Sequence, residues 1–417
     1  MYVKADNRKK CWMATKVVYF IYILYWAWGL EAFPQIGGYL IPLGMLMAGL
    51  TMANYFIVDK RVEPLFPFTI KMWLIFGVSE IIINLIVSNN PRISISQIMI
   101  FIEIIIVLIC LMAISTMDNS ISFVVNTSKT VHIIYALSMM FLAENRSGRL
   151  TLYNSNTDAT VCLAGILLIL VSIKIDRRLL TIIDFGIIAF LFYCILQTGS
   201  RKALICASLF IAIWMISVIR TVNQNNDLSL GDYRHFINTS FLLALIIILT
   251  VGIPQISSSY AFKKLLSGGD ETSDGYRIIM YREAWTYFQS KPLFGIGYDM
   301  FRYTSILHRF SHSTYAEMLS CCGLYGCILY FAPYFYIGKN IYLSTRKEIN
   351  TQSKLKGLTF GIYFIIMLFL GTGMIHFYNE KFILMFGIMT AYIIIESNKE
   401  PEEQCEETKR TYSYIRN

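Results

Sequence analysis

Long apolar runs dominate this chain, and short polar segments separate them. A run of about 20 apolar residues is long enough to cross a lipid bilayer as an α-helix. The pattern predicts twelve spans, near residues 17–33, 36–58, 68–88, 96–115, 127–143, 157–173, 179–197, 202–219, 236–254, 315–338, 357–375 and 378–395. The weakest span is 127–143, because it contains Lys129 and His132. For that segment an interfacial or re-entrant helix stays open as an alternative.

The composition agrees with a polytopic membrane protein. Hydrophobic residues make up 56% of the chain and charged residues 15%, whereas soluble domains are about 45–50% apolar and about 25% charged. Mean hydropathy is +0.54. These values exclude a soluble enzyme, a disordered chain and a protein with a single anchor. The long unbroken runs also exclude a membrane β-barrel, whose strands alternate at period two. We predict an all-α, polytopic integral membrane helix bundle.

The distribution of lysine and arginine predicts the orientation of the chain. With both termini in the cytoplasm, 22 of the 36 Lys and Arg residues fall on the cytoplasmic side, as the positive-inside rule requires. The net charge of +9 is spread over many short loops, so it does not indicate nucleic-acid binding. The basic start of the chain precedes an apolar run without a cleavage site, which is typical of an uncleaved first span.

The predicted spans divide the chain into four parts. Spans 1–9 occupy residues 1–254, and spans 10–12 occupy residues 315–395. Residues 255–314 form one large extracytoplasmic loop, the only extramembrane segment long enough to build structure of its own. The charged tail, 396–417, is expected to be disordered.

The large loop contains one predicted helix. Ser273 and Asp274 are N-cap candidates for a helix over residues 276–289. Its apolar residues have the spacing of one helix face, namely Ile278, Tyr281, Trp285 and Phe288. We expect this amphipathic helix to lie near the membrane surface. After it, Pro292, Gly295 and Gly297 predict a break.

The loop ends at His312, just before the next predicted helix. Thr314 and Glu317 have the spacing of a capping box for that helix. His312 is therefore expected close to a helix N-terminus at the outer membrane face.

Three segments carry motifs of a known family. The first has the pattern P-x-x-G-x-G-x-x-x-F over Pro292–Phe301 and H-x-x-Y-x-E-x-x-x-x-x-G-x-x-G over His312–Gly326. The second is Thr198–Arg201, where a Ser-Arg pair opens a span, and the third is Arg149–Asn156. Over roughly 145–330, this chain resembles the bacterial O-antigen polymerase and ligase superfamily, the Wzy/WaaL-like polysaccharide-assembly enzymes. Ser313 departs from the pattern, because the family usually has Asn at that position.

The resemblance implies a fold and an activity. Such proteins are GT-C-like glycosyltransferases of the bacterial cytoplasmic (inner) membrane, with the active site on the outer face. They transfer a glycan from undecaprenyl diphosphate to an acceptor sugar hydroxyl. Implied partners are the undecaprenyl-diphosphate-linked glycan and a chain-length regulator or other polysaccharide-assembly membrane proteins. No cofactor and no nucleic acid is implied.

The chemistry of such a transfer selects the candidate catalytic residues. A glycosyl diphosphate has a good leaving group, so the site needs fixed positive charge and a group that orients or deprotonates the acceptor. Arginine suits the first task, because its planar fork binds phosphate and stays charged, and we assign it to Arg201 and Arg277. Histidine suits the second, and we assign it to His312 rather than His308. The alternatives are an interfacial anchor and solvated surface residues.

Four further residues are candidate substrate ligands. Arg149 and Asn156 lie in the third motif, and Arg282 competes with Arg277 on the same helix. Five residues separate the two arginines, which is about 140° around the helix, so they are not expected to face one ligand. Glu317 is the fourth, although its spacing favours a helix cap.

The cysteines and the charged residues inside the spans are expected to have structural rather than catalytic roles. No metal-ligand spacing is visible and the cysteines show no disulfide framework, so we expect a metal-independent reaction. Charged residues inside the spans should face the bundle interior, with Lys71 paired to Glu80 or Glu103; Asp184 belongs to the same group.

Three functions follow from these patterns. The first is a polymerase of lipid-linked repeat units in capsule, exopolysaccharide or O-antigen synthesis, and the second is a ligase that moves the finished glycan to another acceptor. The third, from another class, is a transporter of the lipid-linked unit. Transporters of that kind usually show two related halves, and we find no internal repeat here. The sequence leaves the acceptor undetermined.

Overall fold

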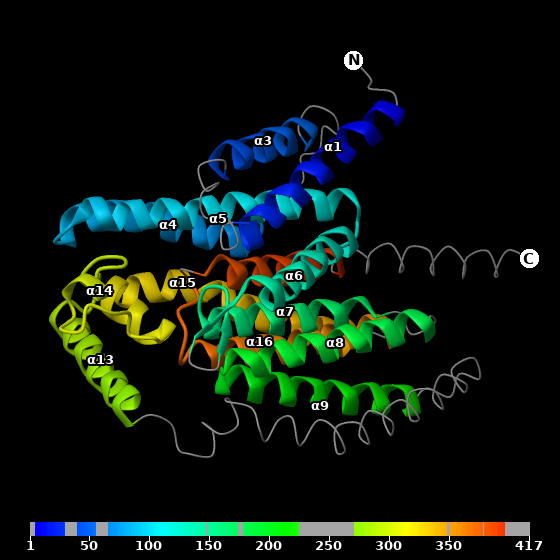
Figure 1. Cartoon of the computed structure of the whole chain (residues 1–417). Coiled ribbons are helices and arrows are strands. Elements are labelled where there is room, and N and C mark those ends of the chain that lie inside the picture. The colour runs from blue at the N-terminus through cyan, green and yellow to red at the C-terminus, as the bar shows by residue number, and fades with distance from the viewer. Residues whose placement is uncertain are drawn as a thin grey trace, which may run out of the picture.

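The chain folds into a bundle of long helices (Figure 1). The computed structural model describes residues 5–29, 40–55, 66–146, 149–173, 178–224, 271–347, 351–377 and 379–396. The predicted span at 236–254 and the tail after residue 396 lie outside the described residues. The same holds for residues 255–270, the first part of the large loop.

Helices account for nearly all of the described chain. In order they are α1 (Ala5–Leu24), the π-helix η1 (Tyr25–Gly29), α3 (Leu40–Ala53), α4 (Phe68–Val87), α5 (Pro91–Met117), α6 (Ser122–Leu142), α7 (Ser155–Ser172), α8 (Arg178–Thr198), α9 (Arg201–Gln224), α13 (Glu271–Ser290), α14 (Phe301–Thr304), α15 (Thr314–Lys347), α16 (Thr351–Leu370) and a last helix at 380–396. In Figure 1, α1 and α3 lie on one side of the bundle and α8 and α9 on the other. Helices α13 and α14 lie at one end of it.

Seven of these helices are long and apolar enough to cross a membrane: α4, α5, α7, α8, α9, α15 and α16. Helices α1 and α3 contain shorter apolar segments, Trp12–Leu24 and Pro42–Ala53. Helix α6 covers the weak predicted span 127–143 but is not among the seven. The prediction of an all-α membrane protein is confirmed, while the count of twelve spans remains a prediction.

A small β-hairpin is the only β-sheet among the described residues. Strands β1 (Glu144–Arg146) and β2 (Arg149–Thr151) pair antiparallel between α6 and α7. The buried carboxylate of Asp158 in α7 accepts hydrogen bonds from the Tyr135 hydroxyl of α6 (2.6 Å) and from the Leu152 amide (2.9 Å). These bonds hold the segment after the hairpin against α6 and α7.

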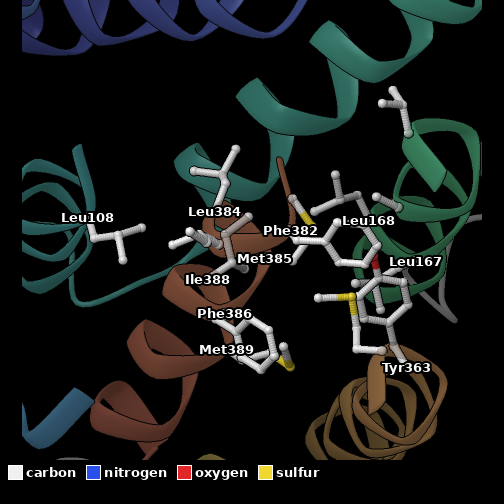
Figure 2. Packing of buried hydrophobic residues seen from close by; sticks show 14 of the residues in the cluster. Leu108, Leu167, Leu168, Tyr363, Phe382, Leu384, Met385, Phe386, Ile388 and Met389 are labelled. Carbon is white, nitrogen blue, oxygen red and sulfur yellow. The ribbon is translucent and has the colours of Figure 1, made fainter. Parts of the chain in front are cut away.

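The last helix lies at the centre of the bundle. Figure 2 shows its apolar side chains packed near buried residues of three other helices, namely Leu108 of α5, Leu167 and Leu168 of α7 and Tyr363 of α16. Gly387 allows α5 to approach, since a Cβ there would lie 2.5 Å from Leu108 Cδ2. Lipid tails are as apolar as these side chains, so the helices associate through close van der Waals packing and interhelical hydrogen bonds.

Charged residues in the spans do not pair as predicted. Lys71 is exposed, and Glu80 is fully buried and accepts a hydrogen bond from Asn84 Nδ2 at 3.0 Å. Glu103 accepts from the Tyr22 hydroxyl (3.3 Å). The prediction that Lys71 pairs with Glu80 or Glu103 is therefore wrong. Lys71 lies in the first turn of α4, nine residues before Glu80, which is roughly 13 Å along the helix axis.

Asp184, the remaining charge of that group, has a basic neighbour on another helix. Its carboxylate lies 4.0 Å from the Lys129 ammonium of α6. This contact accounts for Lys129, the residue that made the 127–143 span the weakest of the series.

Candidate active site

One end of the bundle brings together segments that are far apart in the sequence. Three polar contacts connect them, namely Lys291 Nζ to Val87 O at 3.2 Å, Ser200 Oγ to Asn156 Oδ1 at 2.9 Å and Lys202 Nζ to Thr372 Oγ1 at 3.5 Å. The end of α4 therefore meets the segment between α13 and α15, the turn after α8 meets the start of α7, and the start of α9 meets the turn after α16. All three sequence motifs contribute to this end.

Residues 292–297 pack along the start of α15, and we call this contact the seam. Four backbone hydrogen bonds form it, from Ile296 N to Ser320 O (2.9 Å), Gly297 N to Cys321 O (2.9 Å), Leu324 N to Pro292 O (2.9 Å) and Tyr325 N to Leu293 O (3.1 Å). Helix α15 is kinked at Gly323, where φ is +62°. The kink frees backbone groups of the helix, and the loop pairs with them.

The motif glycines are required by the closeness of this contact. A Cβ on Gly295 would collide with the backbone carbonyl of Cys321, and one on Gly323 would lie 2.5 Å from the carbonyl of Leu293. Both glycines also have positive φ, which costs other residues free energy. The glycine spacing that resembles the family therefore builds a support and supplies no reacting group.

Helix α4 holds the seam from the other side. Asn84 Oδ1 accepts the Tyr298 amide at 2.7 Å, while Asn84 Nδ2 donates to the Glu80 carboxylate and to the Glu80 carbonyl (2.7 Å). Asn84, Glu80 and Tyr298 are fully buried. Gly297 also fits closely, since a Cβ there would lie 2.9 Å from Asn84 Oδ1. Nothing in the sequence pattern indicated that Asn84 reaches this loop.

The capping box predicted for α15 is wrong in its detail. The N-cap is Ser313, whose Oγ accepts the Ala316 amide at 3.4 Å. Thr314 instead donates its hydroxyl to Met374 O at 2.7 Å. Glu317 is one position too far along the helix for a capping box; its fully buried carboxylate accepts the Ser311 amide at 2.7 Å. Glu317 therefore positions the backbone next to His312.

His312 projects from this fixed segment in a left-handed conformation. Its φ is +58°, a region where histidine is tolerated better than most residues. The side chain is half-buried. Burial lowers the pKa of His312 from its usual 6.5, and the charges of Arg277, Arg309 and Lys202 lower it further. The imidazole is therefore neutral at pH 7 and able to accept a proton.

Helix α13 carries Arg277 toward His312. The helix begins at Glu271, so Ser273 and Asp274 lie inside it and the predicted N-cap is wrong. Arg277 is half-buried, whereas Arg282 is exposed. Burial raises the pKa of the Tyr281 hydroxyl, one turn after Arg277, and the Arg277 charge opposes this rise. Arg277 and Tyr281 thus share one face of α13, as their spacing of four residues requires.

The segment around Arg201 lies at the same end of the bundle. Arg201 is the first residue of α9 and is half-buried. The preceding residue, Ser200, bonds to Asn156, which follows the N-cap Asn154 of α7. The structure therefore brings the second and third motifs into contact. Arg149 lies in β2, in register with Arg146.

An apolar cavity of about 320 Å³ adjoins these charges. Most of its lining residues come from two helices, Tyr281, Ala284, Trp285 and Phe288 from α13 and Tyr315, Ala316 and Leu319 from α15; Ser313 and Thr372 complete the lining. The stripe predicted for the amphipathic helix is thus largely a cavity wall, with Trp285 exposed, while Met280 and Ala284 are the buried residues of α13.

The structure adds three polar residues that the sequence did not single out. Lys202 and Arg309 have charges close enough to affect His312, and Thr372 accepts from Lys202. Proximity in the sequence was a signal for the first two, since Lys202 follows Arg201 and Arg309 precedes His312 by three residues. No sequence signal pointed to Thr372. His308 is exposed.

No group of three or more His, Cys, Asp and Glu side chains in the described part of the chain is arranged to hold a metal ion. The charges that act on the His312 imidazole are all cationic, from Arg277, Arg309 and Lys202. Such groups suit an anionic substrate.

Comparison with known sequences found one family whose model covers this region. A sequence model of the O-antigen ligase family matches residues 186–331, which include α9, the seam and His312. No curated protein matches the chain. Over this region, the chain is similar to the O-antigen ligase family, in line with the resemblance seen in the sequence motifs.

Proposed function

We propose that this protein is a polymerase of undecaprenyl-diphosphate-linked oligosaccharide repeat units. It transfers the growing glycan from its lipid carrier to a hydroxyl of the next carrier-linked unit, at the outer face of a bacterial cytoplasmic membrane. The observation that carries the proposal is the half-buried His312, surrounded by cations from α9, α13 and the outer loop.

The proposed chemistry assigns each group one role. The bond between the anomeric carbon and the diphosphate oxygen breaks, and the lipid diphosphate leaves with the electron pair. Arg277 and Arg201 stabilise the charge that develops on it. The acceptor hydroxyl oxygen bonds to the anomeric carbon, and its proton passes to the neutral imidazole of His312. The base contributes because the lowered pKa keeps it deprotonated at neutral pH.

The apolar cavity between α13 and α15 suits the lipid part of the donor. Aromatic and aliphatic side chains line it, and Tyr281 connects it to the face that carries Arg277. A polyprenyl chain in the cavity would place its diphosphate at the cationic rim. Glu317 and Ser311 keep His312 in position at that rim.

A ligase that moves the finished glycan to another acceptor is the second candidate, because it uses the same donor. Complementation of a strain that lacks this gene separates the two. Wild type is compared with Arg201→Ala, Arg277→Ala and His312→Ala at matched membrane expression, and the readout is the length ladder of surface polysaccharide with its lipid-linked precursors.

Single repeat units on the carrier in the variants support the polymerase. Long chains that remain on the carrier support the ligase. Wild-type ladders in all three variants would refute the assignment of Arg201, Arg277 and His312 as catalytic residues. They would favour a transporter of the lipid-linked unit.

A further inference from the structure

Lys202 is held at the centre of this end of the bundle by a turn. It is the second residue of α9 and is half-buried. Its ammonium lies 3.5 Å from the Thr372 hydroxyl, and the adjacent Gly373 has no side chain. A Cβ on Gly373 would collide with the Lys202 ammonium. The Lys202 ammonium thus packs directly against the turn at 371–374.

The same turn is fastened to the two helices that form the candidate site. The Tyr281 hydroxyl of α13 donates to Thr372 O at 3.1 Å. At the start of α15, the Thr314 amide donates to Gly371 O at 2.8 Å, and the Thr314 hydroxyl donates to Met374 O. The turn therefore fixes Lys202 relative to Arg277, which shares a helix face with Tyr281, and relative to His312, two residues before Thr314.

This arrangement concentrates positive charge. Arg201 and Lys202 occupy the first turn of α9, where the positive end of the helix dipole disfavours cations. Arg277 and Arg309 add charge around the same histidine. Like charges at close range are destabilising, and an anionic ligand offsets their repulsion.

We propose that Lys202 is a further ligand of the donor diphosphate, positioned by the Thr372–Gly373 turn and acting beside Arg277. The proposal rests on the proposed function and adds a residue to it. Lysine supplies a compact charge with three rotatable donors, whereas arginine supplies a planar fork. The two together can contact both phosphates of one diphosphate group.

Binding to the purified full-length protein in detergent tests this proposal. The probes are undecaprenyl diphosphate and, separately, inorganic pyrophosphate. Lys202→Gln should weaken binding of both by about 10–100-fold, the value of one charge-assisted hydrogen bond, and Lys202→Arg should restore part of it. Thr372→Val, at an exposed position, keeps the charge but releases the ammonium, and should weaken binding several-fold.

Lys291→Gln is the matched control, because Lys291 is an exposed lysine at the same end that bonds to Val87 O instead. It should bind both probes like wild type. If Lys202→Gln and Thr372→Val bind like wild type while Arg277→Ala is impaired, the role of Lys202 is refuted and the proposed function stands. If Arg277→Ala also binds like wild type, both the role of Lys202 and the proposed function are refuted.

Discussion

The seam and the cationic cluster lie side by side but are built in opposite ways. The seam, residues 292–297 against 320–325, is held by backbone hydrogen bonds and buried glycines. The cationic cluster, which we define as Lys202, Arg277, Arg309 and His312, consists of partly exposed side chains from three segments, namely α9, α13 and the loop before α15. The residues of the seam serve close packing, whereas those of the cationic cluster supply charge. The contrast teaches that the glycine motif supports the loop, while the residues that we propose to react lie beside it.

The largest effect is expected from a glycine of the seam. Gly295→Ala would place a Cβ against the Cys321 carbonyl at a positive φ. Strain and overpacking together should lower the free energy of unfolding by about 2–6 kcal/mol, with loss of activity. Thermal unfolding of the detergent-purified protein measures this.

Gly275→Ala is the control for Gly295→Ala. Gly275 lies in α13 with open space around its Cβ position. The free energy of unfolding of this variant should stay at the wild-type value or rise by roughly 0.5–1 kcal/mol. Equal stability of the two variants would contradict the structural role of the seam.

The second largest effect is expected at His312, where a substitution can separate the role of the imidazole from that of the loop conformation. His312→Asn keeps a residue that tolerates the left-handed backbone but removes the imidazole. The transfer rate should fall by about 10²–10⁴-fold, the usual contribution of a positioned base, with little change in melting temperature. His308→Asn is a matched control, since His308 has φ of +47° but is exposed. A similar loss in both variants would show that the loop conformation, and not the imidazole, is what matters.

A smaller effect is expected where α4 holds the seam. Asn84→Ala leaves the buried Tyr298 amide without its acceptor, which should cost about 1–3 kcal/mol of unfolding free energy. Asn340→Ala is the comparison, because Asn340 bonds only within α15, to Tyr336 O at 2.8 Å, and should change stability by less than about 0.5 kcal/mol. If both variants unfold at the wild-type temperature, α4 is not a support for the seam.

The pH dependence of activity tests the cationic cluster. Burial and then nearby positive charge disfavour protonated His312, so its lowered pKa keeps the base active below pH 6.5. Activity should fall only as the pH drops through that lowered pKa. Lys202→Gln removes one of the cations, which should raise the His312 pKa and move the fall in activity to higher pH. Rate profiles of wild type, Lys202→Gln and Lys291→Gln measure this; an unmoved profile in Lys202→Gln would contradict the cluster.

The smallest effect is expected at Arg282. It lies on α13 with Arg277 but is exposed, and its charge is not among those that shift His312. Arg282→Gln should change the transfer rate by about twofold or less, against about 10-fold or more for Arg277→Gln. Equal losses would mean that both arginines reach the substrate.

Much of the helical architecture followed from local pattern. Apolar runs located all seven of α4, α5, α7, α8, α9, α15 and α16, because a helix in a membrane must satisfy its own backbone groups. The predicted bounds of α4, α7 and α8 agree within two residues, whereas those of α5, α9, α15 and α16 differ by five to nine residues at one end or both. Helix boundaries were less accurate where polar caps decided them. Helix α13 begins before Ser273, and the α15 cap is Ser313 rather than Thr314.

By itself, the sequence determined the membrane class, the helical pattern, the family resemblance and the choice of His312 and Arg277. Those features depend on residue types and spacings along one segment. Only the tertiary structure decided that Asn84 supports Tyr298, that Lys71 pairs with neither predicted partner, and that Thr372 meets Lys202. These contacts join residues about 170 or more positions apart. Their geometry depends on how the whole bundle packs, and no local pattern along the chain encodes it.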